Sequence, residues 1–263
     1  MDFQGKVAVI TGGSLGIGYA AAKRLAQGGA SVVICGSRDT VVKESGQRLQ
    51  EAGLKVKGFK ADVRSAEEVE MLMQYATREY GGIDILVNSA GVQRYGDVLE
   101  TSEEVWDEVI NINLKGMFLS SKYAVKEMRN RGGGAIVNVS SVQAFASQKG
   151  VVAYTASKGG INAMTRAMAL DHADENIRVN VVCPASVDTP MLRGAADLFK
   201  ANKSQEKIVD DWGKMHPVGR VGTPDEVAEM IAFLASDKAK FVTGAEIKID
   251  GGMLAALGVR LPE

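Results

Sequence analysis

Three residues suited to moving a proton to or from an oxygen lie close together in the sequence. Tyr154 and Lys158 are four residues apart, so a helix would carry the phenol and the ammonium on one face. A lysine charge about 5 Å from a phenol, at an effective dielectric of about 20, lowers a pKa of about 10 by roughly two units. Ser140 or Ser141, at the end of the preceding strand-like run, can donate a hydrogen bond to a substrate oxygen. Together they predict acid–base catalysis on a carbonyl or an alcohol.

A glycine-rich run predicts a nucleotide-binding site. It lies between an apolar, strand-like segment and a helix-like one, and it reads Thr11-Gly12-Gly13-Ser14-Leu15-Gly16-Ile17-Gly18. Glycines there permit a tight turn and let the backbone approach a pyrophosphate at the helix N-terminus. The expected cofactor contacts in this run are Gly12, Ser14, Leu15, Gly16, Ile17 and Gly18.

The residues after the second apolar run bear on which dinucleotide binds. A carboxylate at this point would accept hydrogen bonds from the ribose hydroxyls of NAD, but the position is occupied by Gly36. Ser37 and Arg38 offer donors suited to a 2′-phosphate, so we favour NADP. NAD stays the alternative, because a shift of one or two residues would bring Asp39 to the ribose.

Apolar runs of strand length alternate with helix-like stretches along the whole chain. The strand-like runs are Val7–Thr11, Ser31–Cys35, Lys55–Ala61, Ile83–Asn88, Ala135–Ser140, Arg178–Cys183 and Glu246–Ile249. The helix-like stretches are Ile17–Gly28, Thr40–Ala52, Ala66–Tyr80, Ser102–Arg131, Tyr154–Ala173 and Pro224–Leu234. Nearly continuous apolar strands are typical of a parallel sheet covered on both faces. We expect one α/β domain over residues 1–263, a Rossmann-like, doubly wound parallel sheet of about seven strands with helices on both faces.

The least regular stretch covers residues 185–223. Pro184 and Pro217 interrupt it, and it follows the sixth strand-like run. A long insert after the carboxyl end of a strand is a common place for a lid. We expect a substrate loop or lid here, and the alternative is a surface loop with one short helix.

Composition excludes several classes of protein. The chain has 263 residues, a net charge of -1 and 46% hydrophobic residues, which is ordinary for a soluble globular protein and predicts no nucleic-acid partner. Neither a signal peptide nor a membrane span is evident, so we expect no membrane partner and a cytoplasmic location. Two cysteines, Cys35 and Cys183, and two histidines, His172 and His216, form no sequence cluster, so we expect neither a disulfide framework nor a metal site.

From Lys6 to Gly252 the sequence resembles the short-chain dehydrogenase/reductase family. The glycine run and the Tyr154/Lys158 pair carry the resemblance, together with Ala61-Asp62-Val63, Asn88-Ser89-Ala90-Gly91, Asn113, Ser140-Ser141, Pro184 to Thr189 and Ile249-Asp250-Gly251-Gly252. The resemblance implies an NAD(P)-dependent oxidoreductase that acts on CH–OH groups. It also implies a homotetramer or a homodimer.

The resemblance assigns roles to individual positions. Tyr154 would be the general acid in reduction and the base in oxidation, while Lys158 would also bind the nicotinamide ribose. Ser141 would orient the substrate, and Asn113 would hold a proton-relay water. Further cofactor contacts would be Asp62 and Val63 at the adenine, Thr189 at the carboxamide, and Asn88, Ala90, Gly91, Pro184 and Val187 along the cleft.

Three positions depart from the family pattern. Ser89 replaces the second asparagine of Asn-Asn-Ala-Gly, and Ala185 replaces the glycine that usually follows the proline. Leu15 stands where NADP-using members often have a basic residue, which weakens the case for NADP.

Three hypotheses for function follow. The leading one is interconversion of a ketone and a secondary alcohol on a small or medium-sized substrate, such as a steroid, a sugar or a polyol. The second is a 3-oxoacyl-[acyl-carrier-protein] reductase, whose acidic partner would dock on basic residues near the site, with Lys126, Arg129 and Arg131 as candidates. The third is a catalytically silent NAD(P)-binding redox sensor, which the presence of all four catalytic candidates disfavours.

Overall fold

A seven-stranded parallel sheet forms the centre of the protein. The computed structural model describes residues 2–257, and the strand order is β3-β2-β1-β4-β5-β6-β7. The strands are β1 (Val7–Thr11), β2 (Ser31–Gly36), β3 (Val56–Lys60), β4 (Ile85–Asn88), β5 (Gly134–Val139), β6 (Ile177–Pro184) and β7 (Glu246–Ile249). This order reverses between β1 and β4, which confirms the predicted doubly wound fold.

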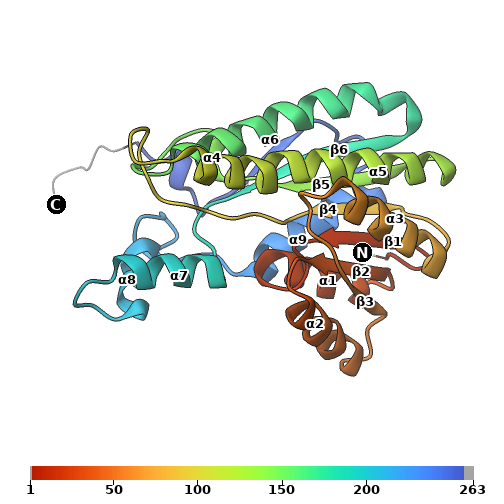
Figure 1. The fold of residues 1–263 in the computed structure, drawn as a ribbon, viewed down its shortest axis with the longest axis horizontal. Coiled ribbons are helices and arrows are strands. Elements are labelled where there is room, and N and C mark those ends of the chain that lie inside the picture. The colour runs from red at the N-terminus through yellow and green to blue at the C-terminus, as the bar shows by residue number, and fades with distance from the viewer. Residues whose placement is uncertain (1, 258–263) are drawn as a thin grey trace.

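Helices cover both faces of the sheet (Figure 1). One layer consists of α1 (Gly16–Gln27), α2 (Asp39–Glu51) and α9 (Pro224–Ala235). The other consists of α3 (Ala66–Tyr80), α4 (Glu103–Ile110), α5 (Gly116–Asn130) and α6 (Val152–Asp171). Every residue of β1 is buried, and so is every residue of β4, because side chains on both faces meet helices.

The long helix predicted over Ser102–Arg131 is helical throughout, but it is not regular. A π-helical turn at Asn111–Lys115 separates α4 from α5. Such a turn holds one extra residue and is frequent at functional sites. It rotates the helix so that Asn113 is fully buried.

The alternative of a surface loop with one short helix over residues 185–223 is wrong, because the region holds two helices. These helices are α7 (Pro190–Phe199) and α8 (Gln205–Gly213), which together make up about half of the region. They lie to one side of the sheet, as Figure 1 shows in cyan. Thr189 caps α7 and Ser204 caps α8, each by accepting a hydrogen bond from a backbone N–H of the first turn. Short 3₁₀ turns complete the described chain at Val142–Ala144, Ala173–Glu175, Asp237–Ala239 and Met253–Ala255.

Residues 2–257 contain neither a helix that could span a membrane nor a cluster of metal-ligating side chains. None of the helices there is long and apolar enough to cross a membrane. Within the same residues, no three His, Cys, Asp or Glu side chains are grouped as metal ligands would be.

Candidate active site

A cleft of about 1240 Å³ opens at the carboxyl ends of the strands. In doubly wound sheets this edge, at the point where strand order reverses, is the ligand-binding position. Most of the site residues expected from the sequence line it, namely Gly12, Ser14, Leu15, Gly16, Ile17, Ser37, Arg38, Asp62, Val63, Ala90, Gly91, Ser141, Tyr154, Lys158, Pro184, Val187 and Thr189. The three that do not are Gly18, Asn88 and Asn113.

The glycine loop passes too close to its neighbours to carry side chains. Gly12 has φ +65°, and a Cβ there would lie 2.7 Å from the Ala90 Cα. A Cβ on Gly18 would lie 2.3 Å from the Gly12 carbonyl oxygen. Gly18 therefore acts by allowing α1 to pack against the loop, not by touching a ligand.

The N-terminus of α1 fits a negatively charged group. Its N-cap is Leu15, which supplies no side-chain hydrogen bond, and the first turn holds no acidic residue. The backbone N–H groups of this turn thus lack a side-chain partner at the edge of the cleft, where a pyrophosphate would satisfy them. The glycine loop and this helix end together fit a dinucleotide cofactor.

The end of β2 has the register expected from the sequence. Gly36 is the last residue of β2, and Ser37 and Arg38 line the cleft. Asp39 is the first residue of α2, does not line the cleft, and pairs with Lys43 at 2.7 Å. The carboxylate considered for NAD thus lies outside the residues that line the cleft.

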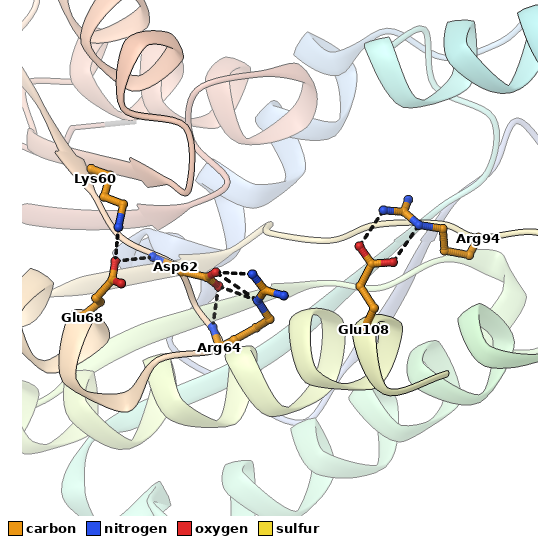
Figure 2. A network of polar contacts seen from close by, with 6 residues as sticks. All are labelled: Lys60, Asp62, Arg64, Glu68, Arg94 and Glu108. Carbon is orange, nitrogen blue, oxygen red and sulfur yellow. Dashed lines mark hydrogen bonds and ion pairs between the residues drawn. The ribbon is translucent and has the colours of Figure 1, made fainter. Parts of the chain in front are cut away.

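Two ion pairs lie on the cleft wall near the predicted adenine site (Figure 2). Arg64 holds the Asp62 carboxylate at 2.6 Å, and this hydrogen bond lowers the pKa of Asp62. Arg94 holds Glu108 through two hydrogen bonds of 2.7 and 2.8 Å. Each carboxylate is balanced by its arginine.

Asn88 does not line the cleft, contrary to the expectation. It is buried under the cleft, where its amide donates to Asn138 at 3.0 Å and to Ser121 at 3.1 Å. Asn138 donates in turn to Thr165 at 2.9 Å. This network ties β4, β5 and α6 together beneath the catalytic residues, so Asn88 supports the site from below.

Tyr154, Lys158 and Ser141 come together at the inner end of the cleft. The Lys158 ammonium lies 5.3 Å from the centre of the Tyr154 ring and donates to the Val139 carbonyl at 3.0 Å. Ser140 donates to the Lys158 carbonyl, which fixes that turn of α6 to the end of β5. The Ser141 hydroxyl oxygen accepts from the Gln143 N–H at 3.1 Å, so its proton remains available to a substrate oxygen or to Tyr154.

The predicted lowering of the phenol pKa by Lys158 is wrong for the protein without a bound ligand. Burial raises the pKa of Tyr154 to about 12, although a hydrogen bond with Ser141 opposes the rise. Burial also lowers the pKa of Lys158 to about 8. Desolvation dominates because both groups are buried and the ammonium lies beside the ring. The phenol is consequently a proton donor at neutral pH.

Asn113 is tied to the chain that follows β4. Its Oδ1 accepts from the Val92 N–H at 2.8 Å, and its Nδ2 donates to the Val92 carbonyl at 2.9 Å and to Ser157 at 3.1 Å. The side-chain amide is thus used in positioning, and the expected role of Asn113 in holding a proton-relay water stays a prediction. A Cβ on Gly91 would lie 3.4 Å from the Asn113 Oδ1 and 3.9 Å from the Lys158 Nζ, so Asn113 adjoins the catalytic lysine across this glycine.

The chain after β6 forms the far side of the cleft. Ala185 tolerates its side chain here, because the positive-φ residues other than glycine within 2–257 are Asn176 and Ala201. Val187 is buried and bridges to Gly222. Thr189 uses its hydroxyl to cap α7 at Leu192. The departure from the usual proline–glycine pair therefore leaves this wall unstrained.

The two histidines have structural partners. His172 contacts Glu175 at 3.2 Å, and Glu175 also pairs with Arg129. His216 lies in the loop after α8 and is buried, with its Nδ1 between the carbonyls of Trp212 and Gly213.

Two residues on the cleft escaped the sequence reasoning. Tyr95 contacts Phe199 of α7 edge to face, and Gln143 holds Ser141 through its backbone N–H. Neither belongs to a recognisable motif, and only the fold brings them to the cleft.

Comparison with known proteins agrees with this geometry. Residues 12–254 match a family model described as enoyl-(acyl carrier protein) reductase. A 3-oxoacyl-[acyl-carrier-protein] reductase of Thermotoga maritima is 39% identical over 260 residues, covering 97% of this chain and all of the relative.

Two solved structures have the same fold over nearly their full length. The aldohexose dehydrogenase of Thermoplasma acidophilum superposes with a TM-score of 0.92 and 37% identity, covering 99% of this chain and 98% of its own. A variant of actinorhodin polyketide ketoreductase with NADPH superposes with a TM-score of 0.91 and 36% identity, covering 94% of this chain and 97% of its own. The chain thus belongs to the short-chain dehydrogenase/reductase family of NAD(P)-binding oxidoreductases that act on CH–OH groups.

Proposed function

We propose that the protein reduces a ketone on a small or medium-sized molecule to a secondary alcohol, and catalyses the reverse reaction at higher pH. The observation that carries the proposal is the meeting of Tyr154, Lys158 and Ser141 in the cleft that also holds the glycine loop. The dinucleotide supplies the hydride. Ser141 orients the carbonyl, Tyr154 gives its proton to the carbonyl oxygen, and Lys158 binds the nicotinamide ribose.

The preferred cofactor in this proposal is NADP. Arg38 and Ser37 support it because they line the cleft at the end of β2, and Asp39 is paired with Lys43. Leu15 supplies no second positive charge, so the preference rests on Arg38.

Titration with NADPH and with NADH tests this preference. We expect tighter binding of NADPH, and Arg38→Ala should weaken NADPH binding roughly tenfold through loss of a charge-assisted hydrogen bond worth about 1.5 kcal/mol. Lys23→Ala removes an exposed charge outside the cleft and is the matched control. Tighter binding of NADH, weakened by Asp39→Asn, would contradict the proposal.

The acyl-carrier-protein alternative receives less support. Two of the three basic residues expected to dock an acidic partner are paired with carboxylates of this chain, Arg129 with Glu175 and Arg131 with Asp84. The relatives include both carrier-protein reductases and small-molecule dehydrogenases, so they do not favour this alternative. The homotetramer or homodimer and the cytoplasmic location stay predictions, as does the role of residues 185–223 as a lid.

A further inference from the structure

Tyr95 brings a free hydroxyl to the substrate end of the cleft. It follows Gly91 on the loop after β4 and lines the cleft. Burial is what raises the pKa of Tyr95, and no residue between Asp2 and Leu257 hydrogen-bonds to its hydroxyl. The hydroxyl is open to the cleft and not buried, since the buried side-chain N or O atom without a partner within residues 2–257 is the Asn88 Oδ1.

The position of the Tyr95 ring is fixed by α7. Its ring contacts that of Phe199, the last residue of α7, with centroids 4.8 Å apart and planes at 85°. Tyr95 and Tyr154 line the same cleft. A substrate that reacts at Tyr154 therefore occupies the cleft into which Tyr95 also faces.

The surroundings of Tyr95 suit an uncharged substrate. The Gln143 side-chain oxygen accepts a hydrogen bond from the Thr155 hydroxyl at 3.2 Å, and its nitrogen donates one to the Gln148 oxygen at 3.3 Å. These hydrogen bonds fix the orientation of two uncharged amides on the cleft. Arg94, which precedes Tyr95 in the chain, is paired with Glu108 at 2.7 Å. A charged group on the substrate would lose water without gaining a partner here.

We propose that Tyr95 is a substrate-binding residue whose hydroxyl hydrogen-bonds to a second oxygen on a neutral ketone, while the Tyr95 and Phe199 rings cover the apolar face of that substrate. The inference rests on the proposed carbonyl reduction. A site built to bond a hydroxyl discriminates strongly against the analogue that lacks it, because its own polar group is then left unpaired.

The test uses cyclohexanone and its 2-, 3- and 4-hydroxy derivatives as substrates, with NADPH oxidation as the readout. We expect kcat/KM of the wild-type protein to be about tenfold higher or more for at least one hydroxy derivative than for cyclohexanone. Tyr95→Phe keeps the ring contact with Phe199 but removes the hydroxyl, so it should abolish that preference, measured as the ratio of kcat/KM for the hydroxy derivative to kcat/KM for cyclohexanone. Phe199→Ala should lower kcat/KM for all four ketones, because it removes apolar contact, and should also weaken the preference, because the Tyr95 ring loses its support.

Tyr75→Phe is the matched control. Tyr75 lies on α3, away from the cleft, and its ring also packs against a phenylalanine, Phe59, at 4.9 Å. The preference for the hydroxy derivative should survive this change.

The outcomes distinguish the role of Tyr95 in substrate binding from the proposed reduction of a ketone. A wild-type protein that reduces all four ketones equally, or a preference that persists in Tyr95→Phe, overturns the role of Tyr95 and leaves the proposed function standing. A wild-type protein that reduces none of them with NADPH or NADH overturns both.

Discussion

Replacement of Lys158 by methionine should stabilise the protein while it destroys the active site. Burial lowers the pKa of Lys158 from 10.5 to about 8, and no carboxylate in the described chain pairs with it. A base whose pKa is lower in the folded state destabilises the fold, and the full cost is present below the folded pKa. At 1.36 kcal/mol per pKa unit, that cost is about 3 kcal/mol at pH 7.

The cost of the charge fades as the unfolded lysine also loses its proton. At pH 9.5 the same two pKa values leave about 1 kcal/mol, so about 2 kcal/mol of the difference disappears between pH 7 and pH 9.5. The methionine variant also loses the hydrogen bond to Val139, which costs about 1 kcal/mol at both pH values. Lys158→Met should thus be about 2 kcal/mol more stable than the wild type at pH 7 and nearly equal to it at pH 9.5.

Urea unfolding without cofactor, followed by far-ultraviolet circular dichroism at one protein concentration, measures the effect. Lys23→Met, which removes an exposed lysine, is the control and should show no comparable change. A stability difference between Lys158→Met and the wild type that is the same at both pH values would refute the reasoning, because only the titration of a desolvated lysine makes it depend on pH.

Two further predictions concern the glycine loop and the catalytic phenol. Gly18→Ala would place a methyl 2.3 Å from the Gly12 carbonyl oxygen, so we expect a loss of about 1–3 kcal/mol in thermal unfolding and weaker NADPH binding by fluorescence titration. Gly194→Ala, which has open space around the added methyl, is the control, and equal losses in both variants would contradict the steric argument. Because burial raises the pKa of Tyr154 to about 12, the phenolate needed for alcohol oxidation increases with pH, whereas the donor form needed for reduction is already complete at pH 7. Initial rates of oxidation should accordingly rise between pH 7 and pH 9 and those of reduction should not, and the opposite pattern would count against Tyr154 as the proton donor.

The regular part of the fold was predictable because it depends on local pattern. The strands are covered on both faces, which forces nearly continuous apolar runs, and the predicted bounds of β1 and β7 agree with the structure. The bounds of α3 agree too, since Ser65 and the left-handed Gly81 end that helix with standard caps.

Features that depend on a single residue or on tertiary burial were not predictable. The π-helical turn at Asn111–Lys115 adds one residue, which hardly changes the spacing of apolar residues along the helix. The sequence pattern therefore predicted one regular helix. The α7–α8 pair was missed because α7 begins at Pro190 and part of its apolar face lies over the cleft instead of the core.

In the candidate site, too, the sequence predicted the positions of residues but not the effects of burial. The positions of Tyr154, Lys158 and Ser141 followed from spacing and from the strand that precedes them, and the three meet in the cleft. The direction of the Tyr154 pKa change did not follow, because a charge four residues away is visible in the sequence and desolvation is not. Asn88 likewise matches a motif at the cleft, yet its amide is used by Asn138 and Ser121.

Turnover of Tyr154→Phe tests the central claim most directly. The change removes the hydroxyl hydrogen-bonded to Ser141 and keeps the buried ring beside Lys158, so the cleft should still bind NADPH as the wild type does. We predict that ketone reduction falls by about a hundredfold or more, the usual contribution of a positioned general acid, while fluorescence titration gives an unchanged dissociation constant for NADPH. Reduction within a few fold of the wild-type rate would contradict the assignment of Tyr154 as the proton donor.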